Sequence, residues 1–380
     1  MRILNVNATL DSVCGGGGAE RTRRLSSALV RQGHFVTVLT TNMKSGTSGL
    51  PRVEGAEVVV LRCLNKRFLV PLLPLGLLRR LIREHDIVHL NGHWTTLNSV
   101  IYLLAKIERK PYAVSPVGTL ALFGRSQKLK RIYNAVVGNS LIRNARAHIA
   151  VTPLEARQFN DYGVESSRVT VIPNGVDAES FAVIDSKPFR ERHGLAKAPL
   201  ILFVGRLNPI KGPDLLLEAF AQVAELFSSY LLIFAGPDEG MEAGLRGDAL
   251  RHGISDRVRF VGYVGGDEKL AAYRSATLLV IPSRMEAMSI VVLEGGAAGT
   301  PVLITDQCGF DIVEEIGGGR VVKAEAVAIA AGLTDMLSDA DNLPNAGRRL
   351  CDTVRRDFTW DAAALRMLTL FKAKLNLGQD

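Results

Sequence analysis

Two carboxylates in one short stretch are the residues best placed to do chemistry. Glu286 and Glu294 lie in residues 281–295, whose pattern predicts a strand, a loop and the start of a helix. At about 1.5 Å of rise per helical residue, Glu294 would lie several ångströms beyond the helix start. A nucleotide sugar could then bind with its sugar near Glu286 and its ribose near Glu294. The diphosphate would lie near free N–H groups at the helix start, those of Ala287, Met288 and Ser289. The alternative for Glu294 is a helix-capping or ion-paired role.

A pair of cations occurs in a second predicted strand-to-helix loop. Arg206 and Lys211 follow the apolar run 200–204 and precede a helical stretch. Ligands of open α/β folds bind at the carboxyl ends of the strands, where both cations would lie. Arginine offers a planar fork and lysine a point charge, so together they suit a diphosphate. The alternative is two solvated charges on a surface loop.

A third candidate is the glycine run after the first predicted strand, from which we expect Gly15, Gly16 and Gly17 to contact the donor. Glycine lets the backbone approach a ligand closely, and a helix N-terminus favours a phosphate or a polar sugar edge. The run is not G-x-G-x-x-G, because Glu20 stands at the last position, and no acid ends the second strand. A nicotinamide dehydrogenase is therefore disfavoured. The alternative is a merely tight turn.

The paired glutamates also suggest a glycosidase, in which two carboxylates about 5–10 Å apart flank a glycosidic bond. The cation pair favours a diphosphate leaving group instead, because Arg206, Lys211 and helix N–H groups can stabilise its developing charge without a metal. The one Asp-x-Asp sequence, at residues 339–341, is far in sequence from these motifs and reads as solvated. We predict no metal site and no cofactor, the nucleotide sugar being a substrate.

These residues depend on alternating strands and helices. Short β-branched runs predict strands near 2–7, 35–40, 57–61, 86–90, 112–115, 147–151, 168–172, 200–204, 230–235, 257–261, 277–281 and 302–305. Helical stretches lie between most of them, including 19–32, 74–84, 95–108, 126–144 and 153–161. Such alternation predicts βαβ units and parallel sheets, and each half is long enough for a sheet of its own. The fold class is therefore α/β, with two doubly wound Rossmann-like domains.

Composition bounds the protein class. The 380 residues are 47% hydrophobic and 22% charged, which fits about two globular domains. The four cysteines are far apart and form no metal-ligand pattern, so we expect a reducing, cytoplasmic setting. The opening residues carry no signal-peptide pattern, and the longest apolar run, 68–78, is too short to span a bilayer.

The motifs together resemble the family-4 retaining glycosyltransferases of the GT-B fold. The likeness rests on Gly205-Arg206 with Lys211-Gly212, the Glu286/Glu294 pair, residues 299–302, residues 172–177 and the glycine-rich turn, in order along essentially the whole chain. The resemblance implies two domains facing a central cleft, an acceptor domain at 1–180, a donor domain at 181–358, and a C-terminal helix at 359–380 crossing back to the first domain. It further implies retention of configuration, with Arg206 and Lys211 on the diphosphate, Glu294 on the ribose and Glu286 on the transferred sugar.

This sequence departs from the family pattern at two places. Family members often have Glu-Gly-Phe-Gly where this chain has residues 286–289, so the amides must approach a ligand past small side chains. Many also carry a sugar-contacting histidine where Val117 stands here. His93, in a predicted loop at a strand end, is a candidate acceptor or sugar contact, although a lone histidine is more often structural. Residues 115–120 resemble members that build bacterial surface polysaccharides.

Charge is uneven along the chain. Residues 1–180 hold 24 Lys and Arg against 12 Asp and Glu, whereas residues 181–380 hold 22 against 26. Residues 66–73 and 77–83 interleave cations with exposed-looking apolar groups, which suits an anionic membrane surface and a lipid-diphosphate acceptor. The alternative is a core-packed helix with basic ends. Nucleic acid is not an expected partner, because aromatic residues are scarce, and the oligomeric state is not indicated.

The leading hypothesis is thus a retaining hexosyltransferase that uses a nucleotide-diphosphate sugar and a lipid-linked or oligosaccharide acceptor, for bacterial surface polysaccharide, in the cytoplasm or on the inner face of the plasma membrane. One alternative is a sugar-nucleotide epimerase or hydrolase of the same shape, which would consume donor without acceptor. A second alternative is a non-catalytic module that binds a sugar nucleotide or a membrane.

Overall fold

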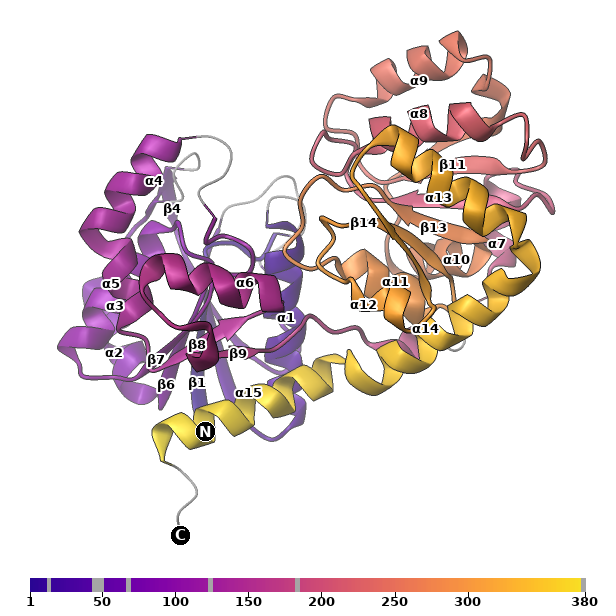
Figure 1. Cartoon of the computed structure of the whole chain (residues 1–380). Helices are drawn as coiled ribbons and strands as arrows, with labels where there is room; N and C mark the ends of the chain where they lie inside the picture. The colour runs from indigo at the N-terminus through magenta and orange to yellow at the C-terminus, as the bar shows by residue number, and fades with distance from the viewer. Residues whose placement is uncertain (12–14, 43–50, 66–69, 122–125, 182–184, 377–380) are drawn as a thin grey trace. The chain divides into compact units, whose positions relative to one another are not determined.

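The chain forms two compact units in a computed structural model (Figure 1), which describes residues 1–11, 15–42, 51–65, 70–121, 126–181 and 185–376. The first unit comprises residues 1–175 with 360–380, and the second comprises residues 176–359. The sequence analysis placed these boundaries at 180/181 and 358/359. Residues 66–69 of the expected membrane-facing stretch lie outside the described residues.

The first unit is built on a seven-stranded sheet with the order β3-β2-β1-β6-β7-β8-β9, in which all neighbouring strands are parallel. The strands are β1 (Arg2–Val6), β2 (Phe35–Thr41), β3 (Glu57–Leu61), β6 (Ile87–Asn91), β7 (Tyr112–Ser115), β8 (Ala147–Ala150) and β9 (Val169–Val171). The helices are α1 (Gly16–Arg31), α2 (Leu75–Glu84), α3 (Thr96–Ile107), α4 (Gln127–Tyr133), α5 (Asn139–Arg143), α6 (Pro153–Gln158) and α15 (Trp360–Leu375).

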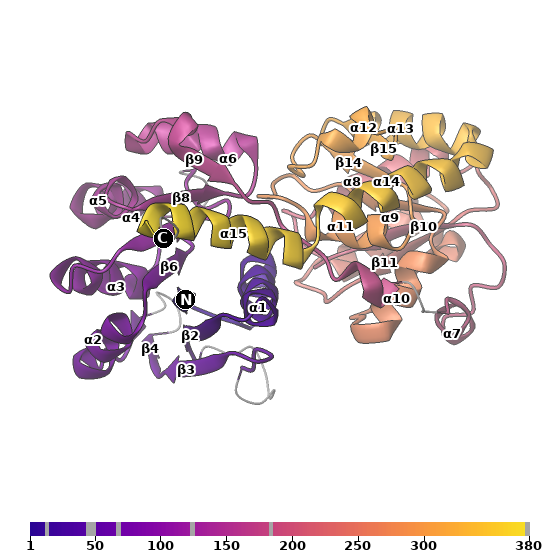
Figure 2. The ribbon, with the colours of Figure 1, turned by 90° about the horizontal axis from the view of Figure 1, so that it is seen from below.

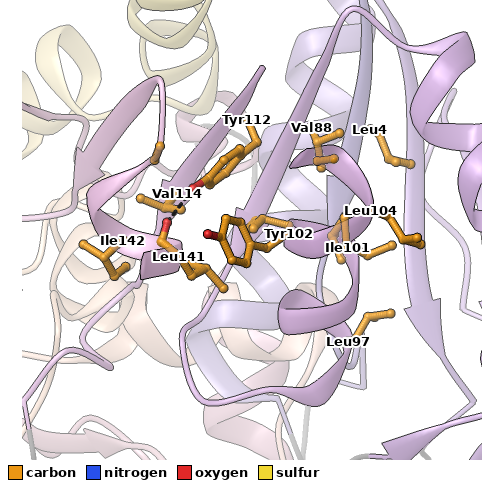
Figure 3. Packing of buried hydrophobic residues seen from close by; sticks show 14 of the residues in the cluster. Leu4, Val88, Leu97, Ile101, Tyr102, Leu104, Tyr112, Val114, Leu141 and Ile142 are labelled. Atoms are coloured by element: carbon orange, nitrogen blue, oxygen red, sulfur yellow. Dashed lines mark hydrogen bonds between the residues drawn. The ribbon is translucent and has the colours of Figure 1, made fainter. Parts of the chain in front are cut away.

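Both faces of this sheet are covered by helices, which is why most of its strand residues are buried. Val88 and Leu90 of β6 belong to a fully buried cluster with Ile101 of α3 (Figure 3). The intervening His89 points to the opposite face, where its ring packs edge-on against Phe371 of α15. The C-terminal helix therefore belongs to the first unit, and Figure 2 shows it running along that unit.

The second unit is built on a six-stranded parallel sheet with the order β12-β11-β10-β13-β14-β15. The strands are β10 (Leu200–Val204), β11 (Leu231–Ala235), β12 (Val258–Gly262), β13 (Leu278–Ile281), β14 (Val302–Thr305) and β15 (Gly319–Val322). The helices are α7 (Lys187–Arg192), α8 (Pro213–Val223), α9 (Glu242–Arg251), α10 (Gly266–Ser275), α11 (Ile290–Ala297), α12 (Ile312–Glu315), α13 (Ala326–Ser338) and α14 (Leu343–Asp357). The two sheets confirm the predicted doubly wound α/β class.

The strand β15 and the hairpin of β4 (Cys63–Asn65) with β5 (Val70–Pro71) were not among the predicted elements. The single helix predicted at 126–144 is observed as one continuous helical segment, in which α4 and α5 are joined by a π-helical turn at Asn134–Gly138. A π turn in a helix often marks a functional position.

The second sheet needs a glycine where β10 and β11 end. A Cβ atom on Gly236, whose φ is +153°, would lie 1.8 Å from the carbonyl oxygen of Gly205. This close approach lets the loop after β10 hydrogen-bond to the loop after β11, through Gly205 N–H to the carbonyl of Ala235 and Leu207 N–H to the carbonyl of Pro237. The two loops are therefore one braced unit.

Replacing Gly236 by alanine should destabilise the second unit by about 2 kcal/mol or more, because the new Cβ overlaps backbone that cannot move without breaking these bonds. Thermal unfolding followed by circular dichroism would measure the loss as a lower midpoint. The control is Gly244→Ala, where a Cβ meets nothing within 4 Å in a helical position. That variant should be as stable as the parent or slightly more stable. Equal midpoints for the two variants would contradict the close approach.

Candidate active site

The strand order brings the cation loop and the first glutamate together. In the second sheet the chain runs outward from β10 through β11 to β12, and then returns to place β13 on the other side of β10. The carboxyl ends of two neighbouring strands whose connections diverge form the crevice where open α/β sheets bind ligands. Residues 205–212 follow β10 and residues 282–289 follow β13, so both loops lie at this crevice.

Lys211 and Glu286 meet there as an ion pair. The Lys211 ammonium donates to a Glu286 carboxylate oxygen at 2.6 Å, and the Ser283 hydroxyl donates to the same oxygen at 3.0 Å. Their side chains are 22% and 13% exposed, so solvent or a ligand still reaches both. The loop can sit this close because Gly212 has a φ of +68° and no Cβ, which would lie 2.2 Å from the carbonyl oxygen of Pro282.

Arg206 is held by residues that the sequence analysis did not single out. One guanidinium N–H donates to a Glu239 carboxylate oxygen at 2.8 Å, and the Asn208 amide donates to the other oxygen at 2.7 Å. Asn208 also accepts a hydrogen bond from the backbone N–H of Lys211 at 3.0 Å. Glu239 follows β11, so no spacing along the chain would have linked it to Arg206.

Arg284 braces the cation loop from the side of β13. Its backbone N–H donates to the carbonyl of Ile210 at 2.8 Å, and its guanidinium donates to the carbonyl of Pro209 and, through two N–H groups, to both oxygens of Asp214. A bidentate arginine–carboxylate pair fixes orientation as well as position. The sequence analysis assigned Arg284 no role.

Glu294 lies on α11 in a different set of contacts. One carboxylate oxygen accepts from the Lys269 ammonium at 2.6 Å, and the other accepts from the Tyr273 hydroxyl at 2.6 Å. Burial and the neighbouring carboxylate raise the pKa of Tyr273 well above its ordinary value, so its hydroxyl stays protonated and donates. The ion-paired alternative for Glu294 is what the structure holds, and its side chain keeps 14% exposure.

The N–H groups before α11 differ from the prediction. The backbone N–H of Ser289 is not free, because it donates to the carbonyl of Cys308 at 2.9 Å. Met288 is buried. The helix has no side-chain cap at Ser289, so its N-terminal N–H groups, beginning with Ile290, have no partner within the helix. The predicted amide contacts of Ser289 are therefore corrected to the first turn of α11.

The glycine-rich turn lies at the corresponding crevice of the first sheet, between β1 and β6. A Cβ on Gly15 would lie 2.6 Å from that of Ala19, and Gly16 has a φ of +51°. Gly17 is exposed in the first turn of α1, which begins without a side-chain cap. Two of the three predicted glycines are thus required by backbone geometry, and the third presents exposed backbone.

His93, at the same crevice, is fully buried rather than exposed in its loop. Its Nε2 lies 2.9 Å from the Asn134 amide oxygen, and its ring packs edge-on against those of Trp94, Tyr133 and Tyr162. Burial is the main cause that lowers the pKa of His93 to about 4, against the weaker effect of the Asn134 hydrogen bond. Its neutral imidazole anchors the π turn onto the loop after β6.

A buried amide network underlies this crevice. The Asn91 amide at the end of β6 donates to the Asn5 amide oxygen of β1 at 2.9 Å and to the carbonyl of Val6. Asn98 of α3 donates to the carbonyls of Asn91 and Gly92. These contacts tie β1, β6 and α3 together below the ligand edge. The sequence analysis missed the network, because isolated asparagines carry no periodic signal.

Within the expected membrane-facing stretch, the apolar side of α2 is packed in the core. Leu78, Leu81 and Ile82 of α2 are buried, and Arg79 and Arg83 are both hydrogen-bonded to Glu108. The prediction of exposed apolar groups is therefore wrong at these three positions, and the core-packed alternative holds for α2. No helix in the described ranges is long and apolar enough to cross a bilayer. Those same ranges contain no group of three His, Cys, Asp or Glu arranged to hold a metal.

Comparison with known proteins decides the family. The profile "Glycosyltransferase Family 4" matches residues 15–180 and the profile "Glycosyl transferases group 1" matches residues 185–349. A D-inositol 3-phosphate glycosyltransferase of Nocardia farcinica is 30% identical over 78% of this chain and 68% of its own length. The chain belongs to the family 4 glycosyltransferases. In three further proteins of the same description the matched segment spans only 54% to 57% of their length.

Solved structures of this glycosyltransferase fold extend the match to nearly the whole chain. Anabaena HepE in complex with UDP has a TM-score of 0.80 at 18% identity and covers 98% of this chain and 100% of its own. Sucrose-phosphate synthase from Thermosynechococcus elongatus has a TM-score of 0.77 at 21% identity and covers 98% of both chains. The family resemblance and the GT-B fold class predicted from the sequence are confirmed.

The buried imidazole gives this glycosyltransferase a testable pH dependence. Because the pKa of His93 is about 4 in the folded chain and ordinarily 6.5, the unfolded chain binds the proton first. Burial and the nearby Arg21 lower the pKa of His89 to about 3, so His89 has the same effect on the free energy of unfolding as His93. The free energy of unfolding should therefore fall as the pH drops from about 6.5 to about 3, and above pH 6.5 these two histidines should no longer make it depend on pH.

NMR titration of the histidine ring nitrogens would measure this directly, with the thermal midpoint recorded at each pH. His93 should remain neutral at pH 6 and titrate near pH 4. A His93 midpoint close to 6.5 would show that the ring is open to solvent and would contradict the aromatic enclosure.

Proposed function

We propose that this family 4 glycosyltransferase moves a hexose-type sugar from a nucleotide-diphosphate sugar to a lipid-linked or oligosaccharide acceptor, with retention of anomeric configuration and without a metal. The observation that carries the proposal is the Lys211–Glu286 pair at the β10/β13 crevice, with Arg206 on the same loop. A cation pair beside a carboxylate suits a diphosphate joined to a sugar better than it suits a neutral glycoside.

The two cations keep capacity for phosphate oxygens. The Lys211 ammonium has three N–H donors and uses one on Glu286, while the Arg206 guanidinium has five and uses one on Glu239. A third of the Arg206 side chain is exposed, at 34%. The structures of Anabaena HepE in complex with UDP and with UDP-glucose support a nucleoside diphosphate here.

Catalysis then consists of stabilising the leaving group. As the bond between the anomeric carbon and the diphosphate oxygen breaks, negative charge grows on the diphosphate, and Arg206, Lys211 and the first turn of α11 lie where they can stabilise it. The acceptor oxygen bonds to the anomeric carbon from the same face, and its proton passes to the leaving phosphate. Glu286 contacts the transferred sugar and Glu294 the ribose hydroxyls, and no protein base is assigned.

The domain roles follow the two crevices. We assign donor binding mainly to the second domain, which the sequence analysis drew at 181–358, and acceptor binding to the first, drawn at 1–180. We also expect Gly15, Gly16 and Gly17 of the glycine-rich turn to contact the donor. His93 acts on the acceptor through the loop after β6 rather than by direct contact, because its ring is buried. A lipid-linked acceptor suits surface polysaccharide assembly on the inner face of the plasma membrane, and a glycosyltransferase of lipopolysaccharide biosynthesis shares the fold.

A thermal-shift screen against UDP, GDP, ADP, dTDP and CMP in EDTA tests the donor site. One diphosphate should raise the melting temperature. At a concentration one hundred times its dissociation constant, it should add about 2.7 kcal/mol to the free energy of unfolding. Turnover of the matching sugar nucleotides with and without acceptor then follows. Donor consumption without any acceptor would indicate a hydrolase or epimerase instead. No shift and no turnover with any donor would contradict the proposal.

Lys211→Ala should lower kcat by about 10²- to 10³-fold, because one charge that stabilises the leaving diphosphate is lost. The thermal midpoint should change little, since Glu286 retains the Ser283 hydroxyl. The matched control is Lys197→Ala, which removes an exposed lysine of the same domain and should leave kcat unchanged. Steady-state kinetics at saturating donor measures both. Unchanged transfer by Lys211→Ala would remove the diphosphate role.

A further inference from the structure

A long segment of the first domain contains no acidic residue. Between Glu108 and Glu155 the chain has eight Lys and Arg and not one Asp or Glu. This segment includes β7, α4, the π turn and α5. The segment therefore has a local positive field, because it contains no carboxylate that could cancel the charge of its cations.

The helix α4 and the π turn combine these charges with exposed apolar side chains. Leu129, Ile132 and Val136 are 56%, 60% and 77% exposed. Their spacing of three and four residues places them on one side of the helix. Lys128 and Arg131 are exposed beside them, and neither has a carboxylate partner among the described residues. We call these five residues the α4 face.

The opposite side of α4 is firmly attached to the domain. The Tyr133 hydroxyl donates to the carbonyl of His93 at 2.7 Å and accepts from the Ser99 hydroxyl at 3.0 Å. Asn134 is hydrogen-bonded to His93 and to the Tyr162 hydroxyl. These contacts fix the helix, so the apolar residues of the α4 face point outward and do not pack in the core.

The α4 face also lies toward the ligand edge of its sheet. The helix follows the loop that leaves the carboxyl end of β7, the edge that also carries the glycine-rich turn and the loop after β6 (Figure 1). Its anchors, His93 and Tyr133, join it directly to the loop after β6. A membrane bound by the α4 face would therefore bring an acceptor embedded in it close to the crevice of the first domain.

We propose that the α4 face docks on an anionic lipid bilayer, with Leu129, Ile132 and Val136 in the headgroup–acyl boundary and Lys128 and Arg131 on lipid phosphates. The proposal rests on the proposed function only in that a lipid-linked acceptor gives the docking its use. A bilayer fits better than nucleic acid, because the exposed side chains between the cations are aliphatic and cannot stack on bases. The surface differs from the stretches 66–73 and 77–83 suggested by the sequence, since Leu78, Leu81 and Ile82 of the second stretch are buried.

Sedimentation of the full chain with vesicles tests the docking. The purified protein should sediment at low salt with phosphatidylcholine vesicles that contain roughly 30 mol% phosphatidylglycerol. Less protein should sediment at high salt, because ions screen the attraction between the cations and the anionic surface. Lys128→Glu/Arg131→Glu should lower the partition coefficient about tenfold or more. Leu129→Glu/Ile132→Glu should lower it comparably and also abolish the fraction that survives high salt.

Two matched controls separate the α4 face from general properties of the chain. Lys197→Glu/Lys323→Glu changes the net charge by the same amount on exposed residues of the second domain, and Leu250→Glu replaces a leucine that is 73% exposed there. Both should bind vesicles like the parent. Circular dichroism and the thermal shift with the donor diphosphate should be unchanged in all variants, which keeps this test separate from the donor site.

Three outcomes would overturn the docking. The first is equal vesicle binding by the parent and the α4-face variants. The second is a loss of vesicle binding in the control variants as large as in the α4-face variants. The third is binding to duplex DNA at the same salt concentration without binding to vesicles. If the vesicle results hold but no donor diphosphate binds, the docking stands and the proposed transfer reaction fails.

Discussion

The side-by-side placement of β10 and β13 is the constraint on which the proposed donor site depends. These strands are neighbours only because the chain builds β11 and β12 on one side of β10 before crossing to the other. That crossing brings Lys211 within 2.6 Å of Glu286, although the two are 75 residues apart in the chain. The first turn of α11 follows the loop after β13, so groups from two loops that are distant in sequence converge at the same crevice.

Precision at this crevice comes from backbone contacts as much as from side chains. The loop after β10 is bonded to the loop after β11 through Gly205 and Leu207, and Arg284 holds it from β13. Carboxylates already occupy one donor of each cation, so the cations are oriented before a diphosphate arrives. Preoriented charge needs little reorganisation during reaction, which is the main way a polar site accelerates charge separation.

The first domain has the same kind of crevice, built from different groups. Its crevice between β1 and β6 is lined by glycine backbone and supported by buried amides and a neutral histidine rather than by ion pairs. The aromatic enclosure of His93 connects that crevice to the π turn and to α4. The crevice proposed for the acceptor and the outward basic, apolar helix are thus parts of one packed cluster, which gives the proposed membrane docking a structural link to the proposed acceptor site.

The sequence by itself determined the strand and helix alternation, the glycine positions and the charge-bearing loops, because periodicity and local turn chemistry act over few residues. It predicted Arg206, Lys211 and Glu286 at strand ends. Only the tertiary structure decided which groups pair with them, such as Glu239 with Arg206 and Tyr273 with Glu294. It also decided that His93 and the apolar side of α2 are buried while α4 is exposed. Burial and partners depend on strand order and on packing between distant segments, which no local pattern encodes.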